Sequence, residues 1–571
     1  MLVSILISLF LTIPYDKIDI SYTRDDTTAL VIKADIIDCK NTPPIVKGDQ
    51  VLLPIDIVKK YFDPNLFFDD KMDRVVITNK DNVLKMKPDS NIIYVNNKPF
   101  KSIISPTVVK GKLYLPINFL KNIYGISINV NSNYNIVAID YKQEIHTEGR
   151  VMQLLPPVRK NKFASSPIIK VVKLNDTLEV FDAYKDWYKV RTKEGLVGFI
   201  GKSNLQLITI VSSEPKNKTY ALKDIRTPKI SLAWDQMLNV NNVNKIDGLQ
   251  IISPFWFYVS DENGTVNSKA SDESMKAYVK KAHQEGYKVW ALFSNSFSPV
   301  ISSSILNDGT LKDKVINQIV SYANTYALDG INIDFENMYN KDKDMFTQFV
   351  KELAPILRAK GKIISVDVGA PSGYANIWGC CDAKALSQVV DYVALMTYDQ
   401  HWSNCPYSGS VAQYSWVEDK LQAALEEVPS SKLLLGIPFY ARGWREEADS
   451  SGAIKVTQYK VFSMNGAVNE VKTNNAKVRW DDESGQLYAE YNKDNAVHKI
   501  WLENEDSINL KSSLVQKYNL AGVAIWEKSY AKPEVWGVLK KNLQQEKSYA
   551  TWIKNNKALY AKIKELYLCK Q

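Results

Sequence analysis

The stretch LDGINIDFENM, residues 328–338, is the most informative segment of this chain. Apolar and polar side chains alternate through it without a break, with Ile331, Ile333 and Phe335 between Asn332, Asp334 and Glu336. Because successive side chains of a β-strand point to opposite faces, the segment predicts a strand with one apolar face and one face that carries an amide and two carboxyl groups. A half-exposed strand whose polar face is solvated is the simpler alternative. The surrounding sequence decides between this strand and one whose polar face forms a functional site.

The surrounding segments alternate between strand-like and helix-like patterns in a way that predicts a (β/α)8 TIM barrel. Residues 272–285, 312–326, 343–358 and 416–427 have helical patterns, and they separate most of eight apolar strand candidates. Eight such strands over about 315 residues fit this fold with one α+β insertion, near 444–512, between strands seven and eight. The predicted strands are 230–234, 249–257, 288–293, 330–335, 362–367, 392–397, 432–438 and 521–526.

The barrel gives the polar face of the fourth strand a chemical meaning. That face points into the barrel, and the active sites of such barrels lie at the C-terminal rim. Side chains two residues apart form one column, so Asp334 and Glu336 are neighbours and Glu336 lies nearer the rim. Buried like charges raise the pKa of one carboxyl group, which then keeps its proton. A protonated acid beside an ionised one is what glycoside hydrolysis requires.

Four motifs in chain order resemble family 18 of the glycoside hydrolases, the chitinase family. DGINIDFE (329–336) resembles the family signature D-G-x-D-x-D-x-E, and LMTYD (395–399) resembles the M-x-Y-D of strand six. GIPFYARGW (436–444) resembles the strand-seven motif, and GVAIWE (522–527) resembles the strand-eight segment whose Trp forms the floor of a sugar subsite. The resemblance covers about residues 220–543 and implies a glycoside hydrolase that needs no cofactor.

The resemblance also implies a role for each matching residue. Glu336 is the general acid that protonates the glycosidic oxygen and then the base for water, and Asp334 orients and stabilises the N-acetyl group of the substrate. The acetamide oxygen attacks the anomeric carbon, so the reaction retains configuration and is substrate-assisted. Tyr398 donates a hydrogen bond to the acetamide carbonyl. The implied substrate-binding residues are Asn332, Asp399, Gln400, Trp526, Tyr440 and Arg442, with ordinary rim packing as the alternative for the last two.

Two positions depart from the chitinase pattern. Asn332 replaces the middle acid of the signature, and LFSNSFS (292–298) stands where the family has Ser-x-Gly-Gly on strand three. An amide at position 332 can accept a hydrogen bond from a protonated Asp334 but cannot share a proton, so we expect a changed pH profile rather than a loss of activity. Both departures are familiar in the members that resemble spore-cortex-lytic N-acetylglucosaminidases of endospore-forming bacteria.

Two small domains are predicted before the barrel. VLLPIDIVKKYF (51–62) is repeated as LYLPINFLKNIY (113–124), and this α+β repeat, over residues 16–145, resembles the N-terminal domain of copper amine oxidases. It has no His cluster, so we expect a spacer or wall-contact domain rather than a copper site. Residues 146–210 resemble a bacterial SH3-like β-barrel, with a hairpin predicted at 186–205. The other predicted segments are a linker at 211–228, the barrel at 229–543 and a helical tail at 544–571.

The composition limits the classes of partner that the protein is expected to bind. The net charge is +9, from 72 Lys and Arg against 63 Asp and Glu, and no dense basic run with interleaved aromatic residues is present, which argues against nucleic acid. A diffuse basic surface favours an anionic polymer such as cell-wall glycan, with simple solubility as the alternative. None of the four His lies in an HExxH pattern and the five Cys show no paired CxxC spacing, so we expect neither a metal site nor a disulfide framework.

The first residues read MLVSILISLFLTIP (1–14). The apolar run is too short for a stable membrane span, and it resembles the apolar core of a secretory signal. We therefore predict that residues 1–15 are a signal or anchor segment and that the protein is secreted or associated with the cell wall or spore envelope. The run lacks Lys and Arg, so a first buried strand, or a start codon assigned too far downstream, is the alternative.

These observations predict a β-N-acetylglucosaminidase that acts on GlcNAc-containing bacterial cell-wall glycan, either peptidoglycan or spore cortex fragments. A chitinase on the same fold is one alternative, because both polymers carry GlcNAc. A non-catalytic glycan-binding or spore-coat protein is another, although such a protein commonly loses the acid that Glu336 provides here.

Overall fold

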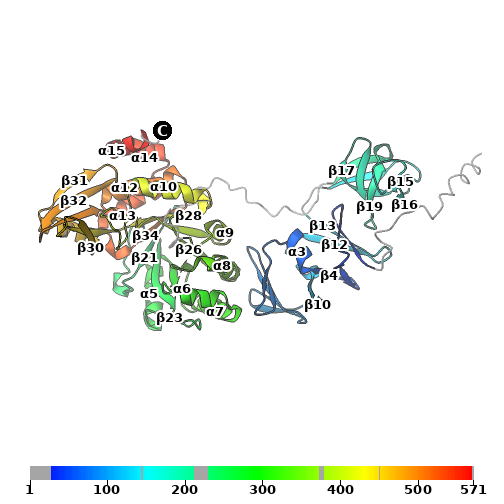
Figure 1. The fold of residues 1–571 in the computed structure, drawn as a ribbon, viewed down its shortest axis with the longest axis horizontal. Helices are drawn as coiled ribbons and strands as arrows, with labels where there is room; N and C mark the ends of the chain where they lie inside the picture. Colours follow the sequence, from blue (N-terminus) through cyan, green and yellow to red (C-terminus); the bar gives the residue numbers. More distant parts are fainter. Residues whose placement is uncertain (1–26, 143–145, 211–228, 372–378, 449, 569–571) are drawn as a thin grey trace, which may run out of the picture. The chain divides into compact units, whose positions relative to one another are not determined.

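The computed structural model describes residues 27–142, 146–210, 229–371, 379–448 and 450–568. They form two compact units (Figure 1): the residues before position 211 form the first, except that Lys80–Val83 group with the second, which the residues after position 228 form. The predicted signal segment, 1–15, and the predicted linker lie outside the described residues. The domain boundaries drawn from the sequence stay predictions.

The C-terminal unit is built on a closed ring of eight parallel strands, which confirms the predicted barrel. Each strand pairs in parallel with its two neighbours, and β21 closes the ring by pairing with both β22 and β34. The strands are β21 (Ile230–Asp235), β22 (Ile251–Val259), β24 (Lys288–Ser294), β25 (Gly330–Asp334), β26 (Ile363–Gly369), β27 (Tyr392–Met396), β28 (Leu433–Pro438) and β34 (Gly522–Trp526). All eight overlap the strands predicted from the sequence.

Helices surround the barrel, as Figure 1 shows. Several begin at a side-chain cap: the Ser271 hydroxyl accepts from the Ser274 N–H at the start of α5, and the Asp308 carboxylate accepts from the Thr310 and Leu311 N–H groups at the start of α7. The principal helices are α5 (Asp272–Gln284), α6 (Pro299–Leu306), α7 (Gly309–Thr325), α8 (Lys343–Arg358), α9 (Ala383–Val389), α10 (Tyr414–Leu425), α12 (Glu505–Lys517) and α13 (Pro533–Lys540).

The strand β25 has the two faces that its alternation predicted. Ile331 and Ile333 are fully buried, and the ring of Phe335 stacks on Phe346 and Phe349 of α8 with centroids 5.4 and 5.6 Å apart. Burying side chains of this size contributes about 1.5–3 kcal/mol each, so the apolar face fixes the strand to the helix layer. The amide and carboxyl groups are thereby turned toward the barrel interior.

A β-bulge in β22 shapes the inner wall next to β24. The pairing register between the two strands shifts between Phe255 and Phe257. As a result Trp256 and Phe257 both face outward, where Trp256 packs on Tyr278 of α5 and Phe257 stacks on Tyr322 of α7. Phe255 is therefore the last inward-facing residue of the regular part of this strand.

The insertion between strands seven and eight is an antiparallel sheet with one helix. Its strand order is β30-β29-β33-β32-β31, and it lies to one side of the barrel in Figure 1. Its elements are β29 (Tyr440–Ala448), β30 (Ile454–Ser463), α11 (Met464–Thr473), β31 (Lys477–Asp481), β32 (Gln486–Lys493) and β33 (Ala496–Leu502). The sheet thus starts a few residues before the insertion predicted at 444–512, and α12 belongs to the outer helix layer.

The C-terminal tail packs on the barrel as two helices, α14 (Tyr549–Asn555) and α15 (Lys557–Leu568). Trp552 is fully buried, and its indole N–H donates to the Asn509 side chain of α12 at 2.8 Å. The Lys562 ammonium lies 4.3 Å from the ring centroid of Trp480 on β31. The tail therefore contacts both the helix layer and the inserted sheet.

The N-terminal unit contains the repeated α+β segment and a small all-β domain. α3 (Ile55–Tyr61) and α4 (Ile117–Leu120) begin directly after Pro54 and Pro116, and the strands before them, β4 (Gln50–Pro54) and β11 (Lys112–Pro116), pair antiparallel. The all-β part is a seven-stranded sheet in the order β16-β15-β19-β18-β17-β14-β20. The strands of this sheet are β14 (His146–Val151), β15 (Pro157–Arg159), β16 (Ile168–Val171), β17 (Thr177–Ala183), β18 (Trp187–Arg191), β19 (Val197–Gly201) and β20 (Leu205–Ile210). In the part of the chain that the structure describes, no helix is long and apolar enough to span a membrane.

Candidate active site

The predicted column on β25 lies at the C-terminal end of that strand. Asn332 is fully buried, Asp334 is 8% exposed, and Glu336, just beyond the strand, is partly exposed. The order from buried amide to accessible acid agrees with the expectation that Glu336 lies nearest the rim.

Asn332 does not interact with Asp334 in the way the sequence suggested. Its amide oxygen accepts from the Trp234 indole N–H at 2.8 Å, and its amide nitrogen donates to Asp367 Oδ1 at 2.7 Å and to Ser365 Oγ at 3.0 Å. The hydrogen bond expected from a protonated Asp334 is not among the contacts of Asn332 in the described residues, because side chains two positions apart on a strand point the same way but stand about 6–7 Å apart, too far for a direct hydrogen bond. The amide instead ties β25 to its neighbour β26.

Asp367 is a third buried acid that the sequence reasoning missed. It lies on β26 and is 2% exposed. The signal was present in the alternation of Ser365 and Asp367 along the predicted fifth strand, which places both on the inner face. Asp367 converts a pair of carboxyl groups into a cluster of three.

The three carboxyl groups have pKa values well above their usual range. Burial raises the pKa of Asp334, and the nearby Asp367 raises it further. Burial also raises the pKa of Glu336, with Asp334 and Asp399 as the next causes. Burial raises the pKa of Asp367 despite the hydrogen bond from Asn332, which lowers it. The cluster therefore titrates as a unit and retains protons at a pH where isolated carboxyl groups have lost them.

One carboxylate oxygen in this cluster has no protein partner. Oδ1 of Asp334 is buried and receives no hydrogen bond from any described residue. A buried polar atom without a partner is unfavourable and calls for a ligand group, such as an N–H donor.

Asn295 holds the backbone that carries Glu336, and the sequence reasoning missed it too. Its side-chain oxygen accepts from the Glu336 N–H at 3.1 Å, and its amide nitrogen donates to the Glu336 carbonyl at 2.6 Å and to Ser302 Oγ at 2.8 Å. Asn295 belongs to the segment LFSNSFS that replaces the expected Ser-x-Gly-Gly. This departure from the chitinase pattern thus supplies a clamp for the catalytic candidate.

The loop after β27 brings Tyr398 and Asp399 to the rim. Burial, followed by the charges of Asp367 and Glu336, raises the pKa of Tyr398 well above its usual value, so its hydroxyl stays protonated and can donate. Asp399 accepts from the Tyr440 hydroxyl and from the Arg442 guanidinium, the latter at 2.6 Å.

Tyr440 and Arg442 lie at the start of β29, so the inserted sheet and the β27 loop meet at Asp399. Gln400 does not join this group: its side chain binds that of Gln413, at 3.2 Å, and accepts from the Gln413 N–H at 3.0 Å. The side chain of Gln400, predicted to bind substrate, is thus bonded to Gln413 and not to the Asp399 group.

Trp526 ends strand β34 and is partly exposed at the rim. Its ring packs against that of Trp234, with centroids 5.6 Å apart, on the inner cluster of the barrel. The peptide bond between Trp526 and Glu527 is cis. The indole is thus packed on Trp234 on one side and partly exposed at the C-terminal end of the barrel.

A pair of adjacent thiols lies near the acid cluster. The Cys380 and Cys381 sulfur atoms are 3.9 Å apart. The hydrogen bond with Cys381 lowers the pKa of Cys380 to about 7, and the charge on Cys380 is a minor cause of the raised pKa of Glu336. Among the described residues, no group of three or more His, Cys, Asp or Glu side chains is placed to hold a metal ion.

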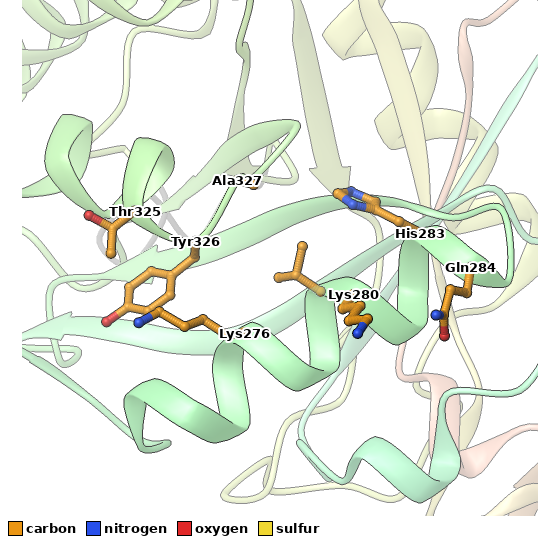
Figure 2. A pocket seen from close by; sticks show the side chains of 8 residues that line it. Lys276, Lys280, His283, Gln284, Thr325, Tyr326 and Ala327 are labelled. Atoms are coloured by element: carbon orange, nitrogen blue, oxygen red, sulfur yellow. The ribbon is translucent and has the colours of Figure 1, made fainter.

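A separate open groove lies in the outer helix layer, between α5 and the end of α7 (Figure 2). Figure 2 shows Lys276, Lys280 and His283 along its α5 side and Tyr326 opposite. None of the residues that line it belongs to the predicted site. The candidate active site is therefore the mouth of the barrel and not this groove.

A TIM barrel with one buried carboxyl group at the end of strand four and a second, more accessible one just beyond it, at a rim with tyrosine and tryptophan, is the arrangement of a glycoside hydrolase. The comparison with known families agrees, since the model of glycosyl hydrolases family 18 matches residues 220–531. The chain belongs to this family. The copper amine oxidase N-terminal domain matches residues 34–139, and the bacterial SH3 domain matches residues 156–206, as predicted.

Several curated proteins are similar to the barrel part of the chain. The uncharacterized glycosylase YvbX of Bacillus subtilis is 26% identical over 296 residues, which are 50% of this chain and 82% of the relative. The cortical fragment-lytic enzyme of the same organism is 29% identical over 253 residues, 43% of this chain and 57% of the relative. Human di-N-acetylchitobiase is 25% identical over 310 residues, 46% of this chain and 75% of the relative.

The fold also matches solved structures. The C-terminal domain of a chitinase-like protein from Desulfitobacterium hafniense DCB-2 superimposes with a TM-score of 0.51 at 24% identity, covering 56% of this chain and all of that one. This match supports the barrel fold alone.

Proposed function

We propose that the barrel is a retaining, substrate-assisted β-N-acetylglucosaminidase that hydrolyses GlcNAc-containing bacterial cell-wall glycan, either peptidoglycan or spore cortex fragments. The observation that carries the proposal is the buried Asp334, whose Oδ1 lacks a partner among the described residues, directly below the more accessible Glu336. An acetamide N–H would satisfy that oxygen, which is what substrate assistance requires.

Glu336 is the proposed acid and base. Burial raises its pKa well above the usual range, so the carboxyl group keeps its proton to a higher pH than an exposed acid and can give it to the glycosidic oxygen as the bond to the anomeric carbon breaks. In the second half of the reaction its carboxylate takes a proton from water, which attacks the same carbon. The Asn295 clamp on both backbone groups of Glu336 holds the acid in place for both steps.

The substrate itself supplies the nucleophile in this proposal. The acetamide oxygen attacks the anomeric carbon and forms a cyclic intermediate whose nitrogen carries positive charge. Asp334 accepts from the N–H and stabilises that charge, while the Tyr398 hydroxyl donates to the carbonyl oxygen and aligns it. Water then opens the ring, and two displacements at one carbon retain its configuration.

The remaining rim residues position the sugar. Trp526 is the proposed stacking platform, because its ring is supported by Trp234 and open toward the mouth. Asp399, Tyr440 and Arg442 form a connected group that would bind sugar hydroxyl groups, with Asn332 as a support for the acid cluster rather than a direct contact.

Bacterial wall glycan is favoured over chitin by two observations. The similar proteins include cortical fragment-lytic enzymes. The domains before the barrel match the copper amine oxidase N-terminal domain and the bacterial SH3 domain, and we propose that both contact the wall. We further propose a wall or spore-envelope location. The similarity to di-N-acetylchitobiase keeps chitin oligomers as the second candidate substrate.

Digestion of purified muropeptides and chitin oligomers, with mass spectrometry of the products, tests the proposal. Glu336→Gln should abolish release of GlcNAc-terminated products, and Glu427→Gln, an exposed residue after α10, is the matched control and should act as wild type. Equal product from the Glu336→Gln and wild-type proteins would contradict the assigned role. Faster cleavage of chitin oligomers than of muropeptides by wild type would favour the chitinase alternative.

A further inference from the structure

The side chain of Lys269 lies over an aromatic ring of the inner wall of the barrel. Lys269 follows strand β23 (Val266–Ser268), which forms a hairpin with β22, and its backbone N–H donates to the Trp256 carbonyl at 2.9 Å. Its ammonium nitrogen lies 3.3 Å from the centroid of the Phe255 ring. The side chain therefore reaches back across the strand toward the barrel interior.

The position of Phe255 indicates the level of the barrel at which this ammonium lies. Ser253 on the same strand reaches Asn332 Oδ1 at 3.5 Å, so these two side chains lie in one layer of the interior. Phe255 is the next inward residue of β22, as Asp334 is the next of β25, and both belong to the layer above. Phe255 also packs on the inner cluster that includes Trp526. Lys269, which covers the Phe255 ring, thus lies at the height of the proposed sugar subsite.

The charge of Lys269 has no counter-ion among the described residues, where no ion pair or side-chain hydrogen bond involves its ammonium. Partial burial lowers its pKa, because desolvation disfavours the charged form. Other cations near the mouth are neutralised: Lys528 pairs with Asp235 at 2.6 Å and Arg442 with Asp399 at 2.6 Å. The ring face attracts the ammonium, and the N–H donors of a lysine can still bind an anionic group.

We propose that Lys269 is a specificity-determining residue that binds a carboxylate carried by the glycan, in the way the lactyl group of N-acetylmuramic acid carries one beside GlcNAc. The proposal rests on the proposed function and narrows its substrate class. Chitin is neutral and offers no such group, whereas peptidoglycan offers a lactyl carboxylate on each N-acetylmuramic acid that carries no stem peptide. The Lys269 ammonium would therefore make the site prefer the acidic polymer.

The test compares two oligosaccharides of equal length: peptide-free peptidoglycan strands with free lactyl carboxylates, and chitin oligomers. Lys269→Met should lower the ratio of kcat/KM for acidic over neutral substrate by about tenfold, the effect of one hydrogen bond to a charged group, and Lys269→Arg should keep most of the ratio. Lys276→Met, on the outer groove of Figure 2, is the matched control and should leave the ratio unchanged. Methyl esterification of the lactyl groups should lower the wild-type ratio by the same factor and leave that of Lys269→Met unaffected.

A third substrate arm, peptidoglycan strands that retain their stem peptides, separates the lactyl carboxylate from carboxylates of the peptide. An effect of Lys269→Met confined to this arm would overturn the assignment to the lactyl group. A ratio unchanged by Lys269→Met, or equal losses on both polymers, would overturn the specificity role.

Calorimetry measures the binding of the same strands to the Glu336→Gln protein. Because this variant should not turn over substrate, the measurement tests the role of Lys269 in binding alone. Weaker binding of acidic strands after adding Lys269→Met supports the inference even if hydrolysis is slow. Unchanged binding overturns it while leaving the proposed hydrolase activity intact. Failure of the proposed function shows itself separately, as wild-type product release no greater than that of Glu336→Gln.

Discussion

Replacing Asn332 by Asp would restore the acid that the chitinase signature has at this position, and it should destabilise the barrel. The Asn332 amide nitrogen donates two hydrogen bonds, to Asp367 at 2.7 Å and to Ser365 at 3.0 Å. A protonated carboxyl group can donate only one, and an ionised carboxylate can donate none. The oxygen that accepts from Trp234 is kept in both cases.

The size of the effect follows from these contacts and depends on pH. With the new carboxyl group protonated, one buried hydrogen bond is lost, which costs about 1 kcal/mol. With it ionised, two carboxylates would face each other in the interior, and an uncompensated buried charge costs about 3 kcal/mol or more. Burial beside Asp367 raises the pKa of the new group in the folded state, while in the unfolded chain it is about 3.9. The variant therefore loses stability relative to wild type as the pH rises above about 4, until the folded pKa is passed.

Thermal unfolding of the full chain at pH 4 and pH 8, followed by near-ultraviolet circular dichroism, measures this difference. For a domain of this size about 1 kcal/mol corresponds to roughly 2 °C in Tm, so we expect a loss of about 2 °C at pH 4 and about 6 °C at pH 8. Asn324→Asp, an exposed position on α7, is the control and should change little at either pH. A variant as stable as wild type at pH 8 would refute the role assigned to the Asn332 amide.

Two further predictions concern activity. The kcat/KM of wild type should fall as the pH rises through the pKa of Glu336, and because burial raises that pKa well above its usual value, the fall should come at a higher pH than for an exposed glutamic acid. A pH–rate profile of muropeptide cleavage locates the fall, and a fall centred at about pH 4–5, the range of an ordinary glutamic acid, would contradict the role of the buried Glu336. Asp399→Asn weakens the contact with Arg442 and should raise KM several-fold with a smaller change in kcat, and a steady-state comparison in which kcat alone falls would place Asp399 in the chemical step instead.

The barrel and the main acids could be predicted because their signals are local. Alternation over residues 328–338 fixes which side chains share a face, and the strand and helix rhythm fixes which face is inside. Apolar strand candidates were sufficient to place all eight barrel strands. Asp334 and Glu336 could be placed on one face from their own segment, and the rhythm of the surrounding strands and helices then placed that face inside the barrel.

The residues that were missed depend on contacts between strands. Asp367 gains its importance from the Asn332 amide on the adjacent strand, and Asn295 from the backbone of Glu336. Lys269 comes to the mouth only because a bulge turns Trp256 and Phe257 outward and a hairpin returns the chain. Alternation within one segment does not encode such contacts, so the wrong partner was assigned to Asn332.

The contact between Asn332 and Asp367 explains why an amide suits position 332. The strand-five acid already places a carboxyl group within hydrogen-bond distance, so a second acid at 332 would face it, while an amide can donate to it. The double variant Asn332→Asp/Asp367→Asn exchanges the two groups and restores one donor and one acceptor. Its unfolding free energy should exceed the sum expected from the single variants by about 1–3 kcal/mol, as for directly bonded neighbours. If the losses of unfolding free energy in the two single variants simply add, the bond between Asn332 and Asp367 contributes nothing to stability. Asn332 would then be held by Trp234 and Ser365 alone, and the burial of Asp367 would be independent of Asn332.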